Sequence, residues 1–224
     1  MKSRKFNKFL MFLLLPLALV AGCAQQGSVD GIDAQSVDDG LLPRKTGLDS
    51  VSAAYAFDLG GAKVFLEPVN IEYRKRYHSI GSPLRDKDYE LEDKDLARLQ
   101  ELMGETLAEA FLAPRRSELV ENRADADYVL QLDLKRFALA APLDPSAWIT
   151  RVYADNSADG TLVGELKDSE GNPVMRFSDR REIGDNLGAF GTMNRYERFN
   201  RVTFWSDMKI DMRRAFSSLD KSLR

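Results

Sequence analysis

Polar and apolar residues alternate strictly from Ala126 to Phe137, which predicts a half-buried β-strand. The apolar face carries Tyr128, Leu130, Leu132 and Leu134, and the opposite face carries Val129, Gln131, Asp133 and Lys135. Successive side chains of a strand point to opposite sides of the sheet, so one side of this strand faces a core. A polar second face favours an antiparallel sheet, because parallel α/β sheets are usually covered on both sides.

Four further segments are predicted to be strands. Ala62 to Tyr73 is rich in β-branched and aromatic residues, and Pro68 within it confines the segment to an edge or a bulge. A short strand is expected around Glu118 to Glu121. Gly160 to Asp168 and Pro173 to Glu182 flank a four-residue turn, 169–172, which predicts a hairpin.

Two segments repeat their apolar residues at the spacing of an amphipathic helix. From Leu96 to Phe111 the apolar positions are Leu96, Leu99, Leu102, Met103, Leu107, Ala110 and Phe111. Asp93 or Asp95 can cap the start of this helix, and Pro114 ends it. The C-terminal positions are Val202, Trp205, Met208, Met212, Ala215, Phe216, Leu219 and Leu223. Such stripes are most often core packing, so both helices are expected to cover a sheet.

The order of these elements predicts an α+β fold. We expect a mostly antiparallel sheet of about four to five strands, with two amphipathic helices packed on one face. The other face of the sheet is expected to be open to solvent.

The first 22 residues have the layout of an export signal. Four basic residues precede an apolar run, which is broken by Pro16 and is too short to span a bilayer. Leu19, Val20, Ala21 and Gly22 lead directly into Cys23, the single cysteine of the chain. This ending resembles the lipobox of bacterial lipoproteins, and the resemblance implies that residues 1–22 are removed and that Cys23 is acylated.

The predicted organisation is therefore a signal peptide (1–22), a lipidated cysteine with a flexible tether (23–50) and one periplasmic domain (51–224). The tether is rich in Gln, Gly, Ser and Asp and lacks a sustained apolar period, although the Leu-Leu-Pro stretch at 41–43 could dock on the domain. By resemblance to Gram-negative lipoproteins, Ala24 after the cysteine favours sorting to the outer membrane. Several acyl chains would hold the protein there stably.

Charge narrows the range of partners. The chain has 32 basic and 35 acidic residues, and loss of residues 1–22 leaves 28 basic against 35 acidic. Binding of a phosphate backbone requires a basic face, so nucleic acid is not expected as a partner. Attraction to anionic lipid is also weak, which leaves the acyl chains as the expected contact with the membrane.

No residue pattern indicates catalysis, a metal or a cofactor. The single histidine, His78, lies in a charged segment without an indicated nucleophile, and zinc would need more Cys or His ligands than the chain offers. Asp155, Asn156, Asp159 and Gly160 are rich in oxygen but lack the closing glutamate of a calcium loop, so a turn is expected there. Carboxylate-only catalysis stays open, because the pairing of acids in space is invisible in a sequence. We therefore expect a protein that is not an enzyme and has no cofactor.

Two loops carry residues suited to binding a partner. Phe190, Met193 and Tyr196 are apolar or aromatic residues in the polar connection 183–194 and just beyond it, and they could equally pack on a helix. Trp148 and Tyr153 lie in a second loop, where they would form either a partner contact or a lid over the sheet.

Several short stretches resemble an uncharacterised family of proteobacterial outer-membrane lipoproteins, a domain of unknown function. The stretches are Val64 to Val69, Ala126 to Leu132, the hairpin Glu165 to Asn172, and Asp179 with Arg180. The chain has Ser-Glu-Gly where the family is expected to have Ser-x-Thr-Gly. The resemblance implies an α+β periplasmic domain and supplies no catalytic residues.

Two functions remain open at this stage. The favoured one is a non-enzymatic module, anchored in the outer membrane and facing the periplasm, that binds a protein of an envelope assembly or transport system. The alternative is a carrier of a lipid or small molecule. A concave apolar pocket would favour the carrier, and an exposed apolar patch would favour the partner module.

Overall fold

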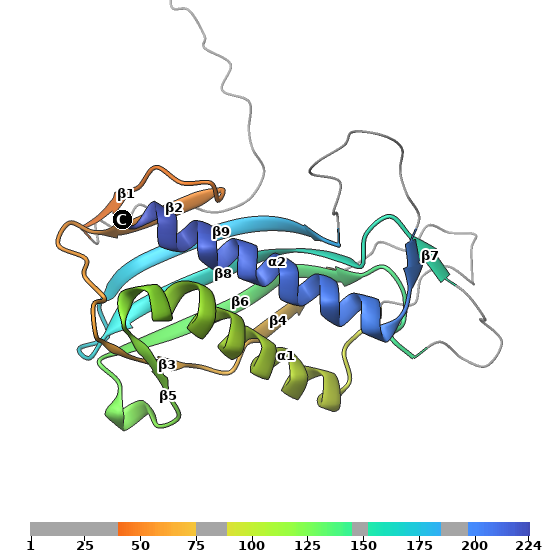
Figure 1. The fold of residues 1–224 in the computed structure, drawn as a ribbon, viewed down its shortest axis with the longest axis horizontal. Coiled ribbons are helices and arrows are strands. Elements are labelled where there is room, and N and C mark those ends of the chain that lie inside the picture. The colour runs from red at the N-terminus through yellow and green to blue at the C-terminus, as the bar shows by residue number, and fades with distance from the viewer. Residues whose placement is uncertain (1–39, 75–88, 145–151, 185–196) are drawn as a thin grey trace, which may run out of the picture. The chain divides into compact units, whose positions relative to one another are not determined.

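Two long helices cross a curved, mixed β-sheet in the computed structural model of the protein (Figure 1). The structure describes residues 40–74, 89–144, 152–184 and 197–224, which belong to one compact unit, Val37–Arg224. The strands are β1 (Leu41–Pro43), β2 (Ser50–Ala54), β3 (Lys63–Leu66), β4 (Asn70–Tyr73), β5 (Glu118–Val120), β6 (Tyr128–Leu139), β7 (Val152–Ala154), β8 (Ala158–Asp168), β9 (Pro173–Ile183) and β10 (Glu197–Phe199). The helices are α1 (Asp93–Leu107) and α2 (Arg201–Ser222).

The main sheet has eight strands among the described residues, and its order is β1-β2-β9-β8-β6-β3-β5, with β4 also paired to β6. In this order, the neighbouring strands β1, β2, β9, β8 and β6 pair antiparallel. β3 and β4 pair with β6 in parallel, and β5 pairs with β3 in parallel. The expected mostly antiparallel sheet of four to five strands with two helices on one face is therefore wrong. The fold is α+β, but its sheet is larger and mixed.

Parallel pairing arises because α1 connects one edge of the sheet back to its centre. The chain leaves β4, passes through α1 and returns through β5 to β6, and such a crossover brings strands into parallel alignment. Pro68 divides the expected first strand into β3 and β4, which pair with successive parts of the same edge of β6. A sequence pattern shows which residues face a core, but it does not show the direction of the neighbouring strand.

The hairpin of β8 and β9 is confirmed. Its two strands pair along nearly their whole length, from Ala158↔Ile183 to Lys167↔Pro173. The Asp168 carboxylate accepts hydrogen bonds from the backbone N–H groups of Glu170 (2.9 Å) and Asn172 (2.8 Å), and Gly171 takes a positive φ of 87°. The turn thus satisfies its own backbone donors and fixes the register.

Helix α1 differs from its expected form at both ends. Glu92 is the N-cap and makes no side-chain cap hydrogen bond, while Asp95, one of the expected caps, is buried and paired with Arg201. After Leu107 the chain continues through a π-helical turn, Ala108–Leu112, and a 3₁₀ turn, Ala113–Arg115. Pro114 lies inside this last turn, so the helical path ends later than the proline alone indicates.

Helix α2 follows its sequence pattern closely. The Asn200 side chain caps it by accepting from the N–H groups of Val202 (2.9 Å) and Thr203 (3.0 Å). The apolar face expected from the sequence is buried from Trp205 to Leu219, but Val202 is 78% exposed. Val202 lies in the first turn of α2, outside the core that the buried apolar side chains further along this helix share.

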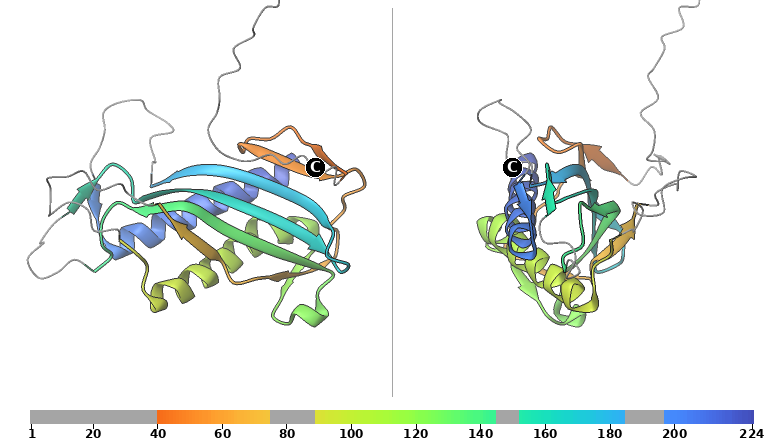
Figure 2. Two further views of the ribbon diagram at one scale, coloured as in Figure 1. Left: turned by 180° about the vertical axis from the view of Figure 1, so that it is seen from behind. Right: turned by 90° about the vertical axis from the view of Figure 1, so that its right-hand side faces the viewer.

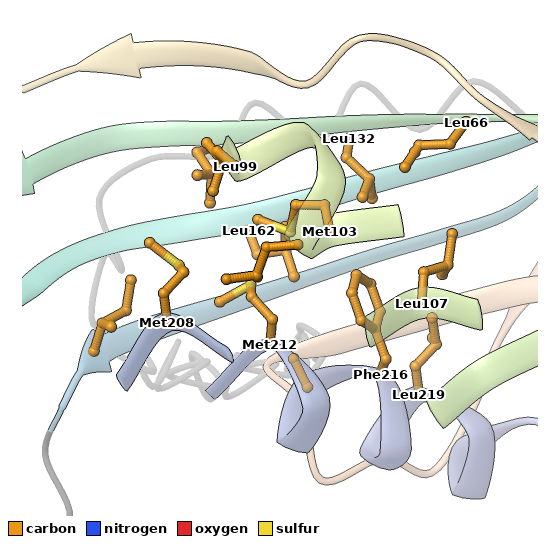
Figure 3. Packing of buried hydrophobic residues seen from close by; sticks show 14 of the residues in the cluster. Leu66, Leu99, Met103, Leu107, Leu132, Leu162, Met208, Met212, Phe216 and Leu219 are labelled. Carbon is orange, nitrogen blue, oxygen red and sulfur yellow. The ribbon is translucent and has the colours of Figure 1, made fainter. Parts of the chain in front are cut away.

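The core lies between the two helices and the sheet. Figure 3 shows side chains of α1, α2 and the central strands meeting there; those labelled are Leu66, Leu99, Met103, Leu107, Leu132, Leu162, Met208, Met212, Phe216 and Leu219. Figure 2 shows α1 and α2 lying next to each other along the curved sheet. Burying each large apolar side chain contributes about 1.5–3 kcal/mol. The face of β6 with Leu130, Leu132 and Leu134 belongs to this core, as its alternation predicts.

Candidate functional site

A surface groove runs between the middle and C-terminal part of α1 and the N-terminal part of α2. Its volume is about 480 Å³. The lining side chains are Arg98, Glu101, Leu102 and Glu105 of α1 and Arg201, Val202, Trp205, Ser206 and Lys209 of α2. The groove therefore combines an aromatic floor, an exposed aliphatic side chain and both signs of charge, a mixture suited to a polar peptide surface. We call it the helix groove.

Trp205 is the residue around which the helix groove is organised. The residue is only 3% exposed, and its indole Nε1 has no hydrogen-bond acceptor within the described part of the chain. The Arg98 guanidinium lies over the indole ring, 4.9 Å from the ring centroid, and Phe204 meets the same ring edge-on at 4.8 Å. The sequence pattern places Trp205 in the core, and its burial agrees with that, but the pattern gives no sign of the groove beside it.

Ion pairs join the two helices along the groove. Lys209 of α2 pairs with Glu105 of α1 at 2.7 Å between the Nζ and Oε1 atoms. Both side chains are well exposed, so this pair contributes at most about 1 kcal/mol to stability. Its effect is on geometry, because it fixes the positions of the Glu105 carboxylate and the Lys209 ammonium group beside the groove.

A second charge cluster fixes the start of α2. Arg201 pairs with the buried carboxylate of Asp95 and with Asp144, and Lys94 reaches Asp144 at 3.0 Å. Hydrogen bonds from Arg201 and then Lys94 lower the pKa of Asp144 from its ordinary value. The first turn of α2, which carries Val202, is thereby tied to the first turn of α1.

Tyr153, one of the candidate partner contacts, lies in a pair of short strands that leads into the start of α2. Tyr153 is in β7, is 55% exposed and is the register partner of Arg198 in β10. β10 ends at Phe199, immediately before the Asn200 cap of α2. Trp148, Phe190, Met193 and Tyr196 lie outside the described residues, as do Leu19, Ala21, Gly22, Cys23 and His78.

Two other clefts are lined mainly by charged side chains. One, of about 450 Å³, lies beside the C-terminal end of α2, where Arg115 pairs with Asp220, and where burial lowers the pKa of Arg115. The other, of about 560 Å³, lies beside β9 and includes Arg180, Arg181 and Arg214 with their acidic neighbours. Charges of both signs alternate in both clefts, which argues against a dedicated anion site.

Neither a metal site nor a membrane-spanning helix is present in the described part of the chain. Within residues 40–74, 89–144, 152–184 and 197–224, no group of three or more His, Cys, Asp or Glu side chains is placed to hold a metal ion. Asp159, one of the oxygen-bearing residues noted in the sequence, is paired with Arg74 at 2.7 Å. Neither α1 nor α2 is apolar enough along its length to cross a bilayer.

Comparison with known proteins yields structural neighbours only. No family model and no curated protein matches the chain. The PelC dodecamer from Paraburkholderia phytofirmans has 16% identity and a TM-score of 0.40, with 75% of this chain and 96% of the PelC chain covered. A point variant of PelC gives 13% identity and a TM-score of 0.40, with 76% and 94% covered.

A third structure, protein XCC0632 from Xanthomonas campestris, belongs to the DUF330 family. It has 10% identity and a TM-score of 0.37, with 75% of this chain and 86% of that chain covered. These neighbours are proteins of proteobacteria, and one represents a domain of unknown function. Likeness at this level carries no functional argument, so the function of this chain has to be argued from its own residues.

Proposed function

We propose that the protein is a lipid-anchored, non-enzymatic interaction module of the cell envelope, and that a partner protein docks in the helix groove. The lipobox-like ending at Cys23 supports the anchor, and the mature chain would face the periplasm from the outer membrane. The groove supports the docking. Its central observation is a buried indole N–H at Trp205 with no acceptor within the described residues, beside an aliphatic side chain, Val202, that is 78% exposed.

The chemistry of the groove suits a peptide surface. A buried donor without an acceptor costs free energy of about 1–3 kcal/mol, and because Nε1 is covered, a partner oxygen would recover part of that cost by displacing the side chains around it. Val202 would be covered at the same time, and tryptophan and arginine are the residue types that most often dominate binding energy at protein interfaces. Arg98 already lies over the Trp205 ring and can turn its remaining donors toward an acidic group.

A carrier of lipids or small molecules is less well supported. Carriers enclose most of their ligand in a pocket lined largely by apolar side chains. The space between the helices and the sheet is instead filled by the core side chains, including Leu99, Met103 and Met212. The helix groove and both charged clefts are open and lined by ionic groups, which suits surface contact better than enclosure of an apolar ligand.

Site-specific photocrosslinking in intact cells tests the proposal. A photoreactive residue at Val202 is expected to capture one recurrent envelope protein, whereas the same residue at Arg123, an exposed position on the β5–β6 connection, is not. Val202→Asp is expected to abolish co-purification of that protein and to leave the melting temperature within about 2 °C, because the side chain is exposed. Cys23→Ser is expected to release the chain from the membrane.

The outcomes separate the two parts of the proposal. A partner captured equally from Val202 and Arg123, or retained by Val202→Asp, overturns the groove as the docking site. Lipid or metabolite that co-purifies without any protein partner favours the carrier. Membrane retention of Cys23→Ser argues against the lipid anchor.

A further inference from the structure

An exposed corner of the molecule lies where the described chain begins. Leu42 of β1 is 46% exposed and Tyr55, which directly follows β2, is 86% exposed. Leu42 is the register partner of Ala53, and Tyr55 and Ala56 form the turn that follows β2, closed by a hydrogen bond from the Phe57 N–H to the Ala54 carbonyl at 3.1 Å, so all three residues lie where β1 begins and β2 ends. We call Leu42, Tyr55 and the exposed Ala56 the β1–β2 corner.

The corner is held rigidly. The Arg44 guanidinium donates to the carbonyl oxygen of Ala54 at 2.9 Å and lies 3.5 Å from that of Tyr55. The Arg44 backbone N–H donates to the carbonyl of Val51 at 2.8 Å, and Lys45 next to it is exposed. The carbonyl oxygens at the end of β2 therefore have partners within the protein. The groups exposed to solvent are the Tyr55 ring and the Leu42 side chain, with Lys45 exposed in the loop between the two strands.

The position of the corner in the chain identifies what can cover it. Gly40, the first described residue, follows Cys23 by only seventeen positions. Even a fully extended chain of that length reaches no more than about 60 Å. If Cys23 is acylated, the chain enters the described domain at the β1–β2 corner, within this reach of the bilayer surface.

From these observations we propose that the β1–β2 corner rests on the phospholipid surface and orients the domain. This inference depends on the lipid anchor of the proposed function. Tyrosine is favoured at membrane–water interfaces because its ring is apolar and its hydroxyl remains hydrated. Leu42 and Ala56 add apolar area, and Lys45 is suited to lipid phosphates. The acyl chains retain the protein, and the corner sets which side faces the bilayer.

The orientation has a consequence for the helix groove. The C-terminal end of α2 lies beside the loop that joins β1 to β2, where the Ser222 hydroxyl and the Thr46 hydroxyl are 2.7 Å apart (Figure 1). The groove lies at the other end of the 22-residue α2, and a helix of that length extends roughly 33 Å. Contact through the corner thus leaves the groove facing away from the lipid and open to a periplasmic partner.

Fluorescence of the full lipidated protein in vesicles tests this surface. Cys23 is the single cysteine, so after acylation a new cysteine is the sole site for a polarity-sensitive dye. The probe position is Ala56→Cys, which leaves Leu42 and Tyr55 intact. The matched control is Ser206→Cys, an exposed position near the start of α2. Vesicles of phosphatidylethanolamine and phosphatidylglycerol carry a quencher attached near the headgroup.

At position 56 we expect at least twofold stronger quenching by the lipid-borne quencher than at position 206, together with protection from aqueous iodide. Leu42→Ser combined with Tyr55→Ser should remove that difference without changing the melting temperature, since both side chains are exposed. Equal quenching at the two positions overturns the inference, as does quenching that survives the double substitution. Protection at position 56 only when a protein partner is added also overturns it in favour of a protein contact.

A separate control distinguishes failure of the anchor from failure of the corner. The protein without a new cysteine should not take up the dye, because its thiol is acylated. Dye uptake at Cys23 would refute the lipid anchor and the membrane surface together. An acylated protein whose position 56 stays exposed to iodide would refute the surface alone.

Discussion

The two halves of the main sheet meet at β6 and are built in different ways. On one side β6, β8 and β9 are strands of eleven or twelve residues that pair antiparallel, and a tight turn joins β8 to β9. On the other side β3 and β4 are strands of four residues each, paired in parallel with β6 after a crossover through α1. The β8–β9 hairpin of the antiparallel half is specified by neighbours in the chain, whereas every parallel pair depends on contacts between distant segments.

The difference appears in how each half satisfies its backbone. Asp168 completes the β8–β9 turn from within the turn itself. At the break between β3 and β4 around Pro68, the side chain of Gln100 in α1 takes the place of a strand partner. Its Oε1 accepts from the Val69 N–H at 2.7 Å, and its Nε2 lies 3.4 Å from the Glu67 carbonyl oxygen. The parallel half therefore uses a helix side chain at the break between its strands, and the antiparallel half uses one just beyond the end of β9, where the Gly184 N–H donates to the Asp211 carboxylate at 2.9 Å.

The largest expected effect is on the core of the antiparallel half. Phe177 of β9 is 2% exposed, and truncation to alanine removes a fully buried ring, so Phe177→Ala should lower the free energy of unfolding by about 3–5 kcal/mol. Urea denaturation measures this loss. Val174→Ala, a half-buried position of the same strand, is the control and should cost much less. A loss below about 1 kcal/mol for Phe177→Ala would show that this half is not tightly packed.

A smaller effect is expected at the residue opposite that ring. Gly164 is the register partner of Phe177, and a Cβ built at Gly164 would lie 2.1 Å from the ring atom Cε1. Gly164→Ala should therefore cost about 1–3 kcal/mol through overpacking. Combining it with Phe177→Leu should cost less than the sum of the two single changes, and simple additivity in this double-mutant cycle would contradict the contact.

The parallel half should respond to loss of the helix side chain. Gln100→Ala leaves the Val69 N–H without its acceptor and should cost about 1–2 kcal/mol. Amide hydrogen exchange provides a local test, because Val69 should exchange faster while amides of the β8–β9 hairpin keep their protection. Faster exchange throughout the sheet would mean that the two halves open together.

The smallest effect concerns an ion pair on the outer face of the antiparallel half. Burial tends to raise the pKa of Glu165, but hydrogen bonds from Lys167 and Arg176 outweigh it and lower the pKa below its ordinary value of 4.5. Because the folded-state pKa is depressed, the pair stabilises the protein above the unfolded-state pKa, and this contribution disappears as pH falls through the folded-state value.

Glu165→Gln should consequently cost less than about 1 kcal/mol at pH 7 and should lose less stability than the parent protein on acidification. Urea denaturation at pH 7 and at pH 3 measures the difference. Glu118→Gln, which changes an exposed carboxylate of β5, serves as the control. An identical loss on acidification in the parent and in Glu165→Gln would refute the assigned contribution of the pair.

Local patterns predicted individual elements well. The alternation in β6, the turn residues between β8 and β9 and the helical spacing in α2 all correspond to elements of the structure. These signals are local, because period, turn chemistry and capping involve residues within a few positions of each other. The short strands β1, β2, β7 and β10 were missed, since three to five residues carry too little pattern to stand out.

The candidate site was less accessible to sequence reasoning. Loop aromatics were favoured as contacts, and of these Tyr153 lies on an exposed strand among the described residues. The helix groove depends on Arg98 of α1 lying over Trp205 of α2, and on Val202 emerging from the core stripe. Both depend on how two distant helices approach each other, which neither helix reveals alone.

The sequence by itself determined the lipobox-like ending at Cys23, the amphipathic helices and the β8–β9 hairpin, because each depends on neighbouring residues. Tertiary structure decided the parallel pairing of β3 and β4 with β6, the completion of their break by Gln100, the burial of Asp95 against Arg201 and the helix groove. These features require segments far apart in the chain to meet, and the free energy that brings them together comes from burial of the shared core.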